Sequence, residues 1–315
     1  MSTLLLCHGL LWLHLHLHLH LPQESSAAAP GVPVPAVSAV DWNTARELAP
    51  GIRLHRDSLS TPRPIRRYVA RIDLQQPGLK LTTTARLEDW ETNKRETRRQ
   101  TARNFLRSER ERSRPVVLAF NADAFSPWPV PFDQETETNL QGFAVSDGQL
   151  VSPGAGTPSF IRWKSKTGSM QVTDAATPPD DIEMAVSGFG FCLLDGTVQP
   201  SGDDLHPRTA LGLSADGRWL LVLVVDGRRH SSLGATTAEL GQWLLELGAD
   251  DGINMDGGGS STLCWWNPDQ PGEDQVELLN RPVGNGLKLL SPIADERSVS
   301  ERANGNNVGV YFQSP

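Results

Sequence analysis

Cysteine is scarce in this sequence, since 315 residues contain only three, at positions 7, 192 and 264. None of them belongs to a CxxC pair or to a Cys/His spacing that holds zinc, so a structural zinc finger is excluded. If the first segment is removed on export, Cys192 and Cys264 remain as an even pair that could form one disulfide in an oxidising compartment. Two buried free thiols are the alternative, and it is the one that we favour.

An excess of basic residues is missing as well. The chain has 29 Lys and Arg against 37 Asp and Glu, which gives a formal net charge of -8. Surfaces that bind nucleic acid are basic because they neutralise phosphates, so we expect no nucleic-acid partner. The remaining composition, 38% hydrophobic and 21% charged, is typical of a folded globular protein with a sizeable core.

The chain also lacks an apolar run long enough for a membrane helix. The apolar stretch from Leu4 to Leu21 is short and broken by histidines, and SSAAAP after it offers Ala27 and Ala29 as a small-residue cleavage site. This pattern predicts a signal-like segment over 1–29 and no stable membrane span after its removal. Residues 30–40, rich in Pro and Ala, are interpreted as a flexible linker before a folded domain at 41–315.

Short β-favouring runs dominate the first half of the predicted domain. Tyr68–Leu74 and Leu79–Thr84 flank the turn signal QQPG and predict a hairpin. A charged stretch from Glu91 to Arg114 carries a narrow apolar stripe typical of a helix. The run VVLAF that follows is apolar enough for a buried strand, and it ends at Asn121. Two further strand pairs are expected at GFAV with QLV and at SFIRW with GSMQV.

The second half of the domain predicts a strand, a helix and a strand in succession. Thr209–Leu213 and Arg218–Val225 flank ADG and predict a hairpin with a central second strand. A helix is expected from Thr236 to about Leu247, with Gly248 as its end, and GINMD predicts the next strand. The two strands around this helix should be near neighbours in one sheet. The predicted class is α+β, with β-rich mixed sheets, a few flanking helices and one main domain.

A glycine-rich segment after the last of these strands is the clearest candidate site. Asp256 is followed by Gly257, Gly258, Gly259 and Ser260, so a carboxylate opens a loop whose backbone can approach a ligand closely. The amides of this loop could hold a phosphate or a sugar oxygen. A nucleotide P-loop is excluded because no lysine stands in the required place, and GxSxG is absent. A glycine-rich turn in which Asp256 bonds its own backbone is the alternative.

Three acidic residues are candidates for the catalytic carboxylate. Asp256 ranks first and Asp226 second, because both follow apolar strands that would end at the same edge of a sheet. Glu239 is the third candidate. It stands three residues after Thr236, however, and a capping box that closes the start of the helix is the interpretation that we favour.

Other polar side chains are candidates for substrate binding. Arg208 suits a phosphate because its guanidinium fork matches two phosphate oxygens. Asn121 is a candidate donor to a sugar, although an Asn at the end of a strand is commonly a turn former. Aromatic and imidazole rings that could line a sugar site, with core or rim packing as the favoured alternative, are those of His206, His230, Trp265 and Trp266.

The ordered segments HPRTALGL, LLVLVVDGR and TTAELGQWLLELGADDGINMDGGGSSTL resemble the phosphodiester glycosidase family. The resemblance implies hydrolysis of a sugar-1-phosphodiester and carries Arg208 and Thr209 over from the PRTA core of the first segment. Members of the family usually have Asn-Gly-Gly-aromatic where this chain has Asn121, Ala122, Asp123 and Ala124 before an aromatic residue. Two glycines are absent here and Asp123 adds a carboxylate, so a reshaped pocket or a different sugar is expected.

These features together predict an exported glycosidase, secreted or held in the periplasm or cell envelope. Its expected partner is a carbohydrate phosphodiester, with Asp256 as the main carboxylate and Arg208 as the phosphate clamp. No cofactor is expected, and the sequence leaves open whether a metal assists. The alternative is a non-catalytic envelope protein that binds sugar phosphates or glycans, which the altered segment at Asn121 favours.

Overall fold

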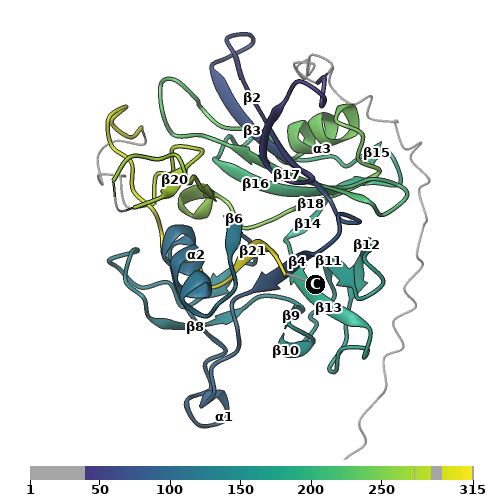
Figure 1. The fold of residues 1–315 in the computed structure, drawn as a ribbon. Coiled ribbons are helices and arrows are strands. Elements are labelled where there is room, and N and C mark those ends of the chain that lie inside the picture. The colour runs from purple at the N-terminus through teal and green to yellow at the C-terminus, as the bar shows by residue number, and fades with distance from the viewer. Residues whose placement is uncertain (1–39, 273, 285–292, 314–315) are drawn as a thin grey trace, which may run out of the picture. The chain divides into compact units, whose positions relative to one another are not determined.

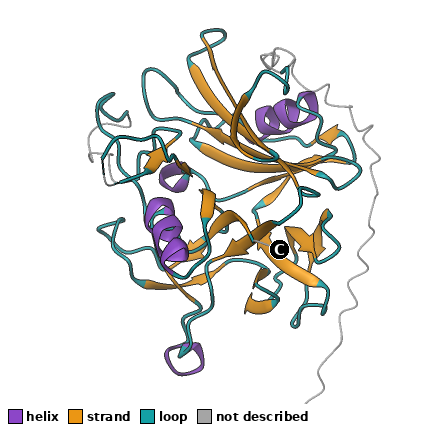
Figure 2. Cartoon of the chain, in the orientation of Figure 1, coloured by secondary structure: helices purple, strands orange, loops and turns teal. Residues whose placement is uncertain are grey.

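The computed structural model describes residues 40–272, 274–284 and 293–313. The signal-like segment and almost all of the predicted linker lie outside the described residues. Strands dominate the described chain, and a few short helices pack against them (Figures 1 and 2). This arrangement confirms the α+β prediction with β-rich sheets. Among the described residues, no helix combines the length and the apolar character that crossing a membrane requires.

The largest sheet has eight strands in the order β1-β2-β3-β17-β16-β18-β14-β15, and its neighbours pair antiparallel. The helix α3 (Thr237–Glu246) packs on one face of this sheet through Leu240, Trp243 and Leu244 (Figure 1). The bounds are β1 (Arg46–Ala49), β2 (Ile52–Leu59), β3 (Ile65–Asp73), β14 (Gly190–Leu194), β15 (Thr197–Val198), β16 (Arg208–Leu213), β17 (Trp219–Val225) and β18 (Asp251–Asn254).

The predicted strand, helix and strand are confirmed as β17, α3 and β18. Only β16 separates the two strands, and it runs antiparallel to both, so β17 and β18 run in the same direction. Asp226 and Asp256 therefore follow strands that end at one edge, where β16 begins with Arg208. The helix ends as predicted, since Gly248 has a φ of 97°, a left-handed conformation that glycine adopts at low cost.

A five-stranded sheet, in the order β20-β19-β6-β21-β4, carries the other half of the site. Its central strand β6 (Val116–Asn121) is the buried strand predicted from VVLAF. The helix α2 (Ala102–Glu111) packs its predicted apolar stripe of Ala102, Phe105 and Leu106 against this sheet. The other strands are β4 (Leu79–Thr83), β19 (Leu263–Trp266), β20 (Val276–Leu278) and β21 (Asn307–Phe312).

Two smaller sheets complete the described strands, in the orders β10-β9-β13-β11-β12 and β5-β8-β7. The first contains both of the strand pairs predicted in the middle of the chain. Its strands are β9 (Ala144–Ser146), β10 (Gln149–Ser152), β11 (Thr157–Trp163), β12 (Gly168–Thr173) and β13 (Ile182–Ser187). The second consists of β5 (Thr97–Arg98), β7 (Phe125–Ser126) and β8 (Glu137–Leu140), and α1 spans Trp90–Asn93.

The hairpin predicted between Tyr68–Leu74 and Leu79–Thr84 is wrong. β3 pairs with β2 on one side and β17 on the other, so both of its edges are occupied. β4 pairs instead with β21 in the other sheet. Both segments have the alternation of a strand, and this alternation does not tell which partner a strand will find.

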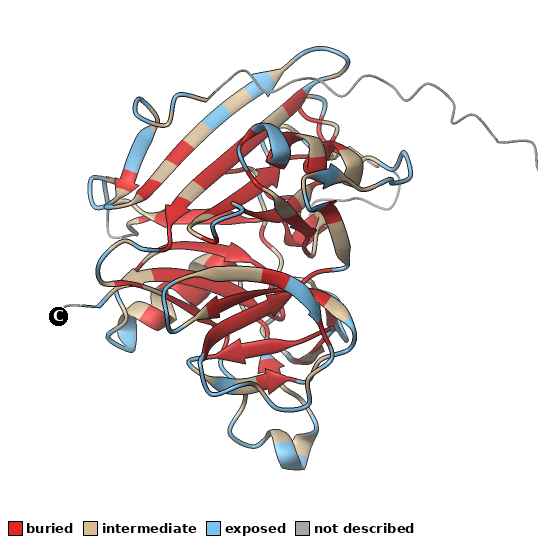
Figure 3. Cartoon of the chain, turned by 90° about the vertical axis from the view of Figure 1, so that its right-hand side faces the viewer, coloured by how far each residue is buried: buried red, intermediate tan, exposed pale blue. Residues whose placement is uncertain are grey.

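The core lies between the sheets, and Figure 3 shows buried residues concentrated in their strands. One cluster joins three sheets through residues such as Leu118, Phe160 and Val222. The two cysteines outside the signal-like segment, Cys192 and Cys264, are free and buried in separate clusters, as the favoured alternative predicted. Burial raises the pKa of the Cys192 thiol to about 12.

Candidate functional site

Asn121 ties the two large sheets together at the end of β6. Its Nδ2 donates to the carbonyl oxygen of Asp256 at 2.7 Å. Its Oδ1 accepts from the Thr209 hydroxyl at 2.7 Å and from the Thr262 amide at 3.1 Å. The Asn121 side-chain amide, predicted from the sequence as a donor to sugar, is thus hydrogen-bonded to protein groups. The Thr209 hydroxyl is one of these groups. Both residues hold the loop after β18 in place.

The glycine loop is held by its own backbone amides. The Asp256 amide donates to Ala122 O at 3.0 Å, and the Gly258 amide donates to Pro207 O at 2.8 Å. The Gly257 amide donates to the Asp256 carboxylate at 3.0 Å, which is the backbone bond of the alternative interpretation. Residues Gly258–Ser260 form a single 3-10 turn. Since these amides are engaged, positive side chains around the loop matter more for holding an anion.

Three arginine side chains approach the loop, one beside each glycine. A Cβ on Gly257 would lie 3.8 Å from Arg208 Cδ, and a Cβ on Gly258 would lie 3.2 Å from an Arg228 Nη. At Gly259 a Cβ would come within 2.7 Å of an Arg302 Nη. Gly259 therefore leaves room for the Arg302 guanidinium, whereas Gly258, with a φ of 61°, also serves the turn, and the atom nearest to a Cβ on Gly257 is Pro207 O at 3.0 Å.

Sequence reasoning found only one of these three arginines. Arg228 stands in the quoted segment LLVLVVDGR, so the motif itself held the signal. Arg302 lies far along the chain in ERANGNN, and no local pattern marks it as a partner of the glycine loop.

The three arginines are half-buried positive charges. Burial lowers the pKa of each, and the charge of Arg302 further lowers the pKa of Arg228. Arg208 donates to the backbone, from Nε to Ala235 O at 3.1 Å. None of the three takes part in an ion pair within the part of the chain that the structure describes. Because unpaired buried charge is costly, a bound anion would stabilise this cluster.

Asp256 is the first residue of the glycine loop, and its carboxyl group titrates near neutral pH. Burial raises its pKa to about 6, while the Ser260 hydroxyl, the Arg302 charge and the Gly257 amide act in the opposite direction. The Ser260 hydroxyl lies near the carboxylate, but its geometry falls short of a hydrogen bond. Protein atoms surround Asp256 closely, yet the residue keeps part of its surface accessible. It can therefore ionise near neutral pH and still meet a ligand.

Asp123 places a second carboxyl group near Asp256. It accepts from the Ser187 amide at 2.7 Å and from Asn306 Nδ2 at 2.8 Å, and it is 1% exposed. Burial raises its pKa to about 7, and the charge of Asp256 contributes in the same direction. Two coupled carboxyl groups that titrate near neutral pH are typical of functional sites.

The carboxylates of Asp226 and Glu239 are both engaged by protein donors. Asp226 is buried and accepts from the Tyr68 hydroxyl at 3.2 Å and from the Arg281 amide at 2.9 Å. Glu239 completes the predicted capping box with Thr236 and also pairs with Arg63 at 2.5 Å. Asp226 lies at the predicted edge, but its oxygens are taken up by protein donors. The structure brings Asp256, rather than these two residues, to the arginine cluster.

The sequence of residues 116–300 matches the Phosphodiester glycosidase family. The chain belongs to this family. A similar solved structure is the catalytic domain of zebrafish N-acetylglucosamine-1-phosphodiester alpha-N-acetylglucosaminidase, with 15% identity and a TM-score of 0.58 over 85% of this chain and 86% of that one. A Burkholderia pseudomallei K96243 protein matches with 13% identity and a TM-score of 0.50 over 79% of this chain and 74% of that one. No curated protein sequence matches the chain.

In this phosphodiester glycosidase family member, some of the buried polar atoms without a hydrogen-bond partner among the described residues lie on or beside the glycine loop. Such atoms usually mark a place for water or a ligand. Those on or beside the loop are Asn254 Oδ1, His206 Nδ1, Ser260 Oγ, Ser261 Oγ, Thr262 Oγ1 and Arg302 Nε.

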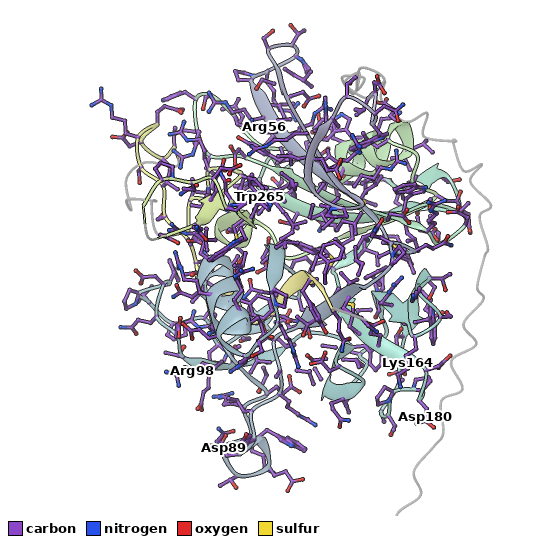
Figure 4. The ribbon with its side chains drawn as sticks, viewed as in Figure 1. Arg56, Asp89, Arg98, Lys164, Asp180 and Trp265 are labelled. Carbon is purple, nitrogen blue, oxygen red and sulfur yellow. The ribbon has the colours of Figure 1, made fainter. Side chains whose placement is uncertain are left out.

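Trp265 and Trp266, the two tryptophans that could have lined a sugar site, pack against other parts of the protein. Trp265, labelled in Figure 4, is 6% exposed and belongs to the core. The ring of Trp266 lies 3.6 Å from the Arg110 guanidinium and packs beside α2. His230 is exposed, and His206 lies beside Arg208, whose charge adds to burial in lowering the His206 pKa. Of these rings, His206 alone is close to an arginine of the site.

Two other features of the described chain lie away from the glycine loop. A cavity of about 650 Å³ lies between residues 84–89, which precede α1, and the side chains of α2. Asp89 and Arg98, which Figure 4 labels, belong to its lining. Asp195, Asp250 and Asp251 are close enough to share a cation, but they lie at the opposite end of β18 from Asp256. Neither feature adds a group to the candidate site.

Proposed function

We propose that this chain is an exported glycosidase that hydrolyses a sugar-1-phosphodiester at the glycine loop. The observation that carries the proposal is the meeting, on one loop, of the Asp256 carboxylate with three guanidinium groups that form no ion pair among the described residues. A sugar-1-phosphodiester needs both kinds of group, a carboxylate at the anomeric carbon and positive charge at the phosphate. Membership of the phosphodiester glycosidase family supports the same reaction.

The proposed reaction adds water to the anomeric carbon. The water oxygen bonds to this carbon while the bond from the carbon to the phosphate oxygen breaks with its electron pair on the phosphate. One proton of the water passes to solvent or to the phosphate, and the products are a free sugar and a phosphate monoester. Positive charge that develops on the sugar ring is stabilised by Asp256, which is ionised above a pH of about 6. Arg208, Arg228 and Arg302 stabilise the leaving phosphate, whose monoester is a stable anion, so that protonation of the leaving oxygen matters less.

The remaining predicted residues position these groups. Asn121 and Thr209 hold the loop through the Asp256 carbonyl, as their hydrogen bonds indicate. Asp123 is too buried to meet the substrate and holds the segment after β6 through its hydrogen bonds with the Ser187 amide and Asn306 Nδ2. Gly258 leaves room for the Arg228 guanidinium and Gly259 for that of Arg302, while Gly257 approaches Pro207 O. Export is proposed from the signal-like segment at 1–29.

The test is turnover of a panel of sugar-1-phosphodiesters, with the released sugar and phosphate monoester identified. Asp256→Asn keeps the shape of the site and should lower kcat by about two to three orders of magnitude, while substrate binding stays nearly intact. Arg208→Lys keeps a charge but loses the fork, so it should weaken both binding and turnover.

Two controls make this test specific. Arg218, in the turn before β17, forms an ion pair with Asp73 at 2.7 Å. Arg218→Lys makes the same substitution as Arg208→Lys away from the glycine loop and should leave activity unchanged. On a glycoside with a neutral leaving group, Asp256→Asn should still be inactive and Arg208→Lys should approach wild type. Binding of sugar phosphates without any product would instead favour the non-catalytic binding protein, and normal turnover in both variants would place the site elsewhere.

A further inference from the structure

Two indole rings pack on the guanidinium group of Arg71 at one end of the largest sheet. The central guanidinium carbon lies 3.6 Å from the centre of the Trp219 ring and 5.2 Å from that of Trp42. Both distances are within the range of cation–π contact. Because a planar guanidinium that is already held by rings loses little freedom on binding, its N–H edge is ready to meet a ligand.

The Arg71 side chain has neither a hydrogen-bond acceptor nor an ion-pair partner among the described residues. Two acidic residues in this region are engaged elsewhere. Asp73 accepts from Arg218 Nε at 3.0 Å and from its Nη2 at 2.7 Å. Glu47 accepts from Arg53 Nη2 at 3.1 Å. The N–H groups of Arg71 are therefore left for solvent or for a ligand.

Positive charge is concentrated around Arg71. Arg53 on β2 is its direct partner across the two strands, and like charges in such a pair are destabilising. Burial lowers the pKa of Arg71, the charge of Asp73 acts in the opposite direction, and the charges of Arg218 and Arg53 lower this pKa further. An anion bound beside Arg71 would offset the repulsion between the arginines.

A cavity of about 150 Å³ lies against the Arg71 side chain. Arginine is the only charged residue type in its lining, which consists of Trp42, Asn43, Gly51, Arg53, Arg71 and Trp219. Pockets for drug-sized molecules have volumes of about 300–1,000 Å³. The smaller cavity at Arg71 therefore suits a single charged group rather than a whole nucleotide or oligosaccharide.

The length of β17 separates this cavity from the glycine loop. Trp219 is the first of the seven residues of β17, and Asp226 follows the last of them. At about 3.3 Å per residue, the strand is about 20 Å long. Figure 1 shows β2, β3 and β17 side by side in the upper part of the view. An anion in the cavity would thus not touch the groups at the glycine loop.

We propose that Arg71, held by Trp42 and Trp219, forms a second binding site whose ligand is an oxyanion, a phosphate or carboxylate group. The guanidinium fork matches two oxygens of either group. A free anion and an acidic glycan both carry such a group, and the experiments below distinguish these two sources. The inference does not rest on the proposed function, because it concerns the opposite end of β17 from Asp226.

The first experiment reports on this site alone. Full-length protein labelled with fluorotryptophan gives one fluorine resonance for each tryptophan, and Trp42→Phe and Trp219→Phe assign two of them. Inorganic phosphate and acetate, titrated at an ionic strength kept constant with sodium chloride, should shift both resonances until the shifts saturate. Arg71→Gln should raise the dissociation constant at least about tenfold, the loss expected when charge-assisted hydrogen bonds are removed.

Arg110 provides a matched control. Its guanidinium carbon also lies 3.6 Å from the centre of an indole ring, that of Trp266, but its Nη1 donates to Val116 O at 3.1 Å. Arg110→Gln should leave the shifts of Trp42 and Trp219 unchanged. Arg208→Lys should leave them unchanged as well, which separates this site from the glycine loop.

Asn43→Asp tests the site without altering the stacked rings. Asn43 is exposed and lines the cavity, so the variant adds a negative charge there and should weaken anion binding about tenfold. This variant keeps the proposal testable even where Arg71→Gln fails to fold. Shifts that never saturate would overturn the proposal. Wild-type affinity in folded Arg71→Gln or in Asn43→Asp would overturn it too.

The second experiment identifies the source of the anionic group. Polygalacturonate is compared with free galacturonate at the same carboxylate concentration, and dextran serves as the neutral polymer. An acidic glycan as ligand predicts saturation by the polymer at a carboxylate concentration at least about tenfold lower, whereas a free anion as ligand predicts equal concentrations. Equal shifts with dextran would overturn the proposal. Arg71→Gln should cleave sugar-1-phosphodiesters as the wild type does, so failure of the proposed function would leave this site unaffected.

Discussion

Replacing Gly259 with alanine should weaken anion binding at the loop without unfolding the protein. The new Cβ would lie 2.7 Å from an Nη, 2.9 Å from Cζ and 3.1 Å from Nε of Arg302. All three atoms belong to the far end of a flexible side chain, so the guanidinium can move away. The backbone at Gly259 is outside the left-handed region, and alanine can adopt its conformation.

The expected magnitudes follow from these contacts. Alanine reduces the freedom of the unfolded chain, which stabilises a protein by about 0.4–1 kcal/mol where the backbone is compatible. Displacing the guanidinium offsets much of this gain, so the free energy of unfolding should change by less than about 1 kcal/mol. Loss of a charge-assisted hydrogen bond to a bound phosphate costs about 1.5–3 kcal/mol, which corresponds to about 10- to 150-fold weaker binding.

Two other glycines serve as comparisons. Gly258 has a φ of 61°, so Gly258→Ala should lose about 1–2 kcal/mol of stability through backbone strain. Gly202 is exposed, and a Cβ added there would meet no described atom within 4 Å, so Gly202→Ala should change neither property. Calorimetry with methyl phosphate and denaturant unfolding measure the two effects. Normal phosphate affinity in a stable Gly259→Ala protein would show that Arg302 does not contact the anion.

Three further predictions concern the charges of Arg302 and Asp123 and the capping box at the start of α3. Arg302→Gln removes the positive charge that lowers the pKa of Asp256, so the acid limb of the pH–rate profile should move above a pH of about 6, and an unmoved limb would contradict the assignment. Asp123 has a pKa of about 7 when folded, above its unfolded value, so the stability that its protonated form contributes at low pH is lost as the pH rises to about 7. Asp123→Asn should flatten this fall, whose limiting slope is about 1.4 kcal/mol per pH unit, in unfolding measured between pH 4 and 7. Glu239→Ala removes the capping-box acceptor and the partner of Arg63, so it should cost about 0.5–2 kcal/mol of stability and leave kcat unchanged, whereas a large loss of kcat at full stability would restore Glu239 as a catalytic candidate.

Local patterns in the sequence determined much of the secondary structure and the centre of the site. The apolar run before Asn121 became β6, and Thr236 with Glu239 became the cap of α3. The hairpin of β16 and β17 formed as predicted, because a turn between two apolar runs specifies its partner locally. Asp256 was found at the head of its loop for the same reason, since a strand and its end are set by neighbouring residues.

The tertiary structure decided which groups meet at that loop. β4 pairs with β21 rather than with β3, because β2 and β17 occupy both edges of β3. The alternation of apolar and polar residues in a strand does not determine which partner it pairs with. Asp226 follows its strand as predicted, yet donors brought by Tyr68 and Arg281 take up its oxygens.

The arginines show the same division between sequence and structure. Arg208 could be proposed from its motif, whereas Arg302 reaches Gly259 only because the chain returns to the loop after the family segment. Hydrophobic periodicity is a property of neighbouring residues, and it therefore predicts strands and helices. The partners of a charge depend on packing between segments far apart in the chain, so the place of Arg302 beside the glycine loop could be recognised only in the folded protein.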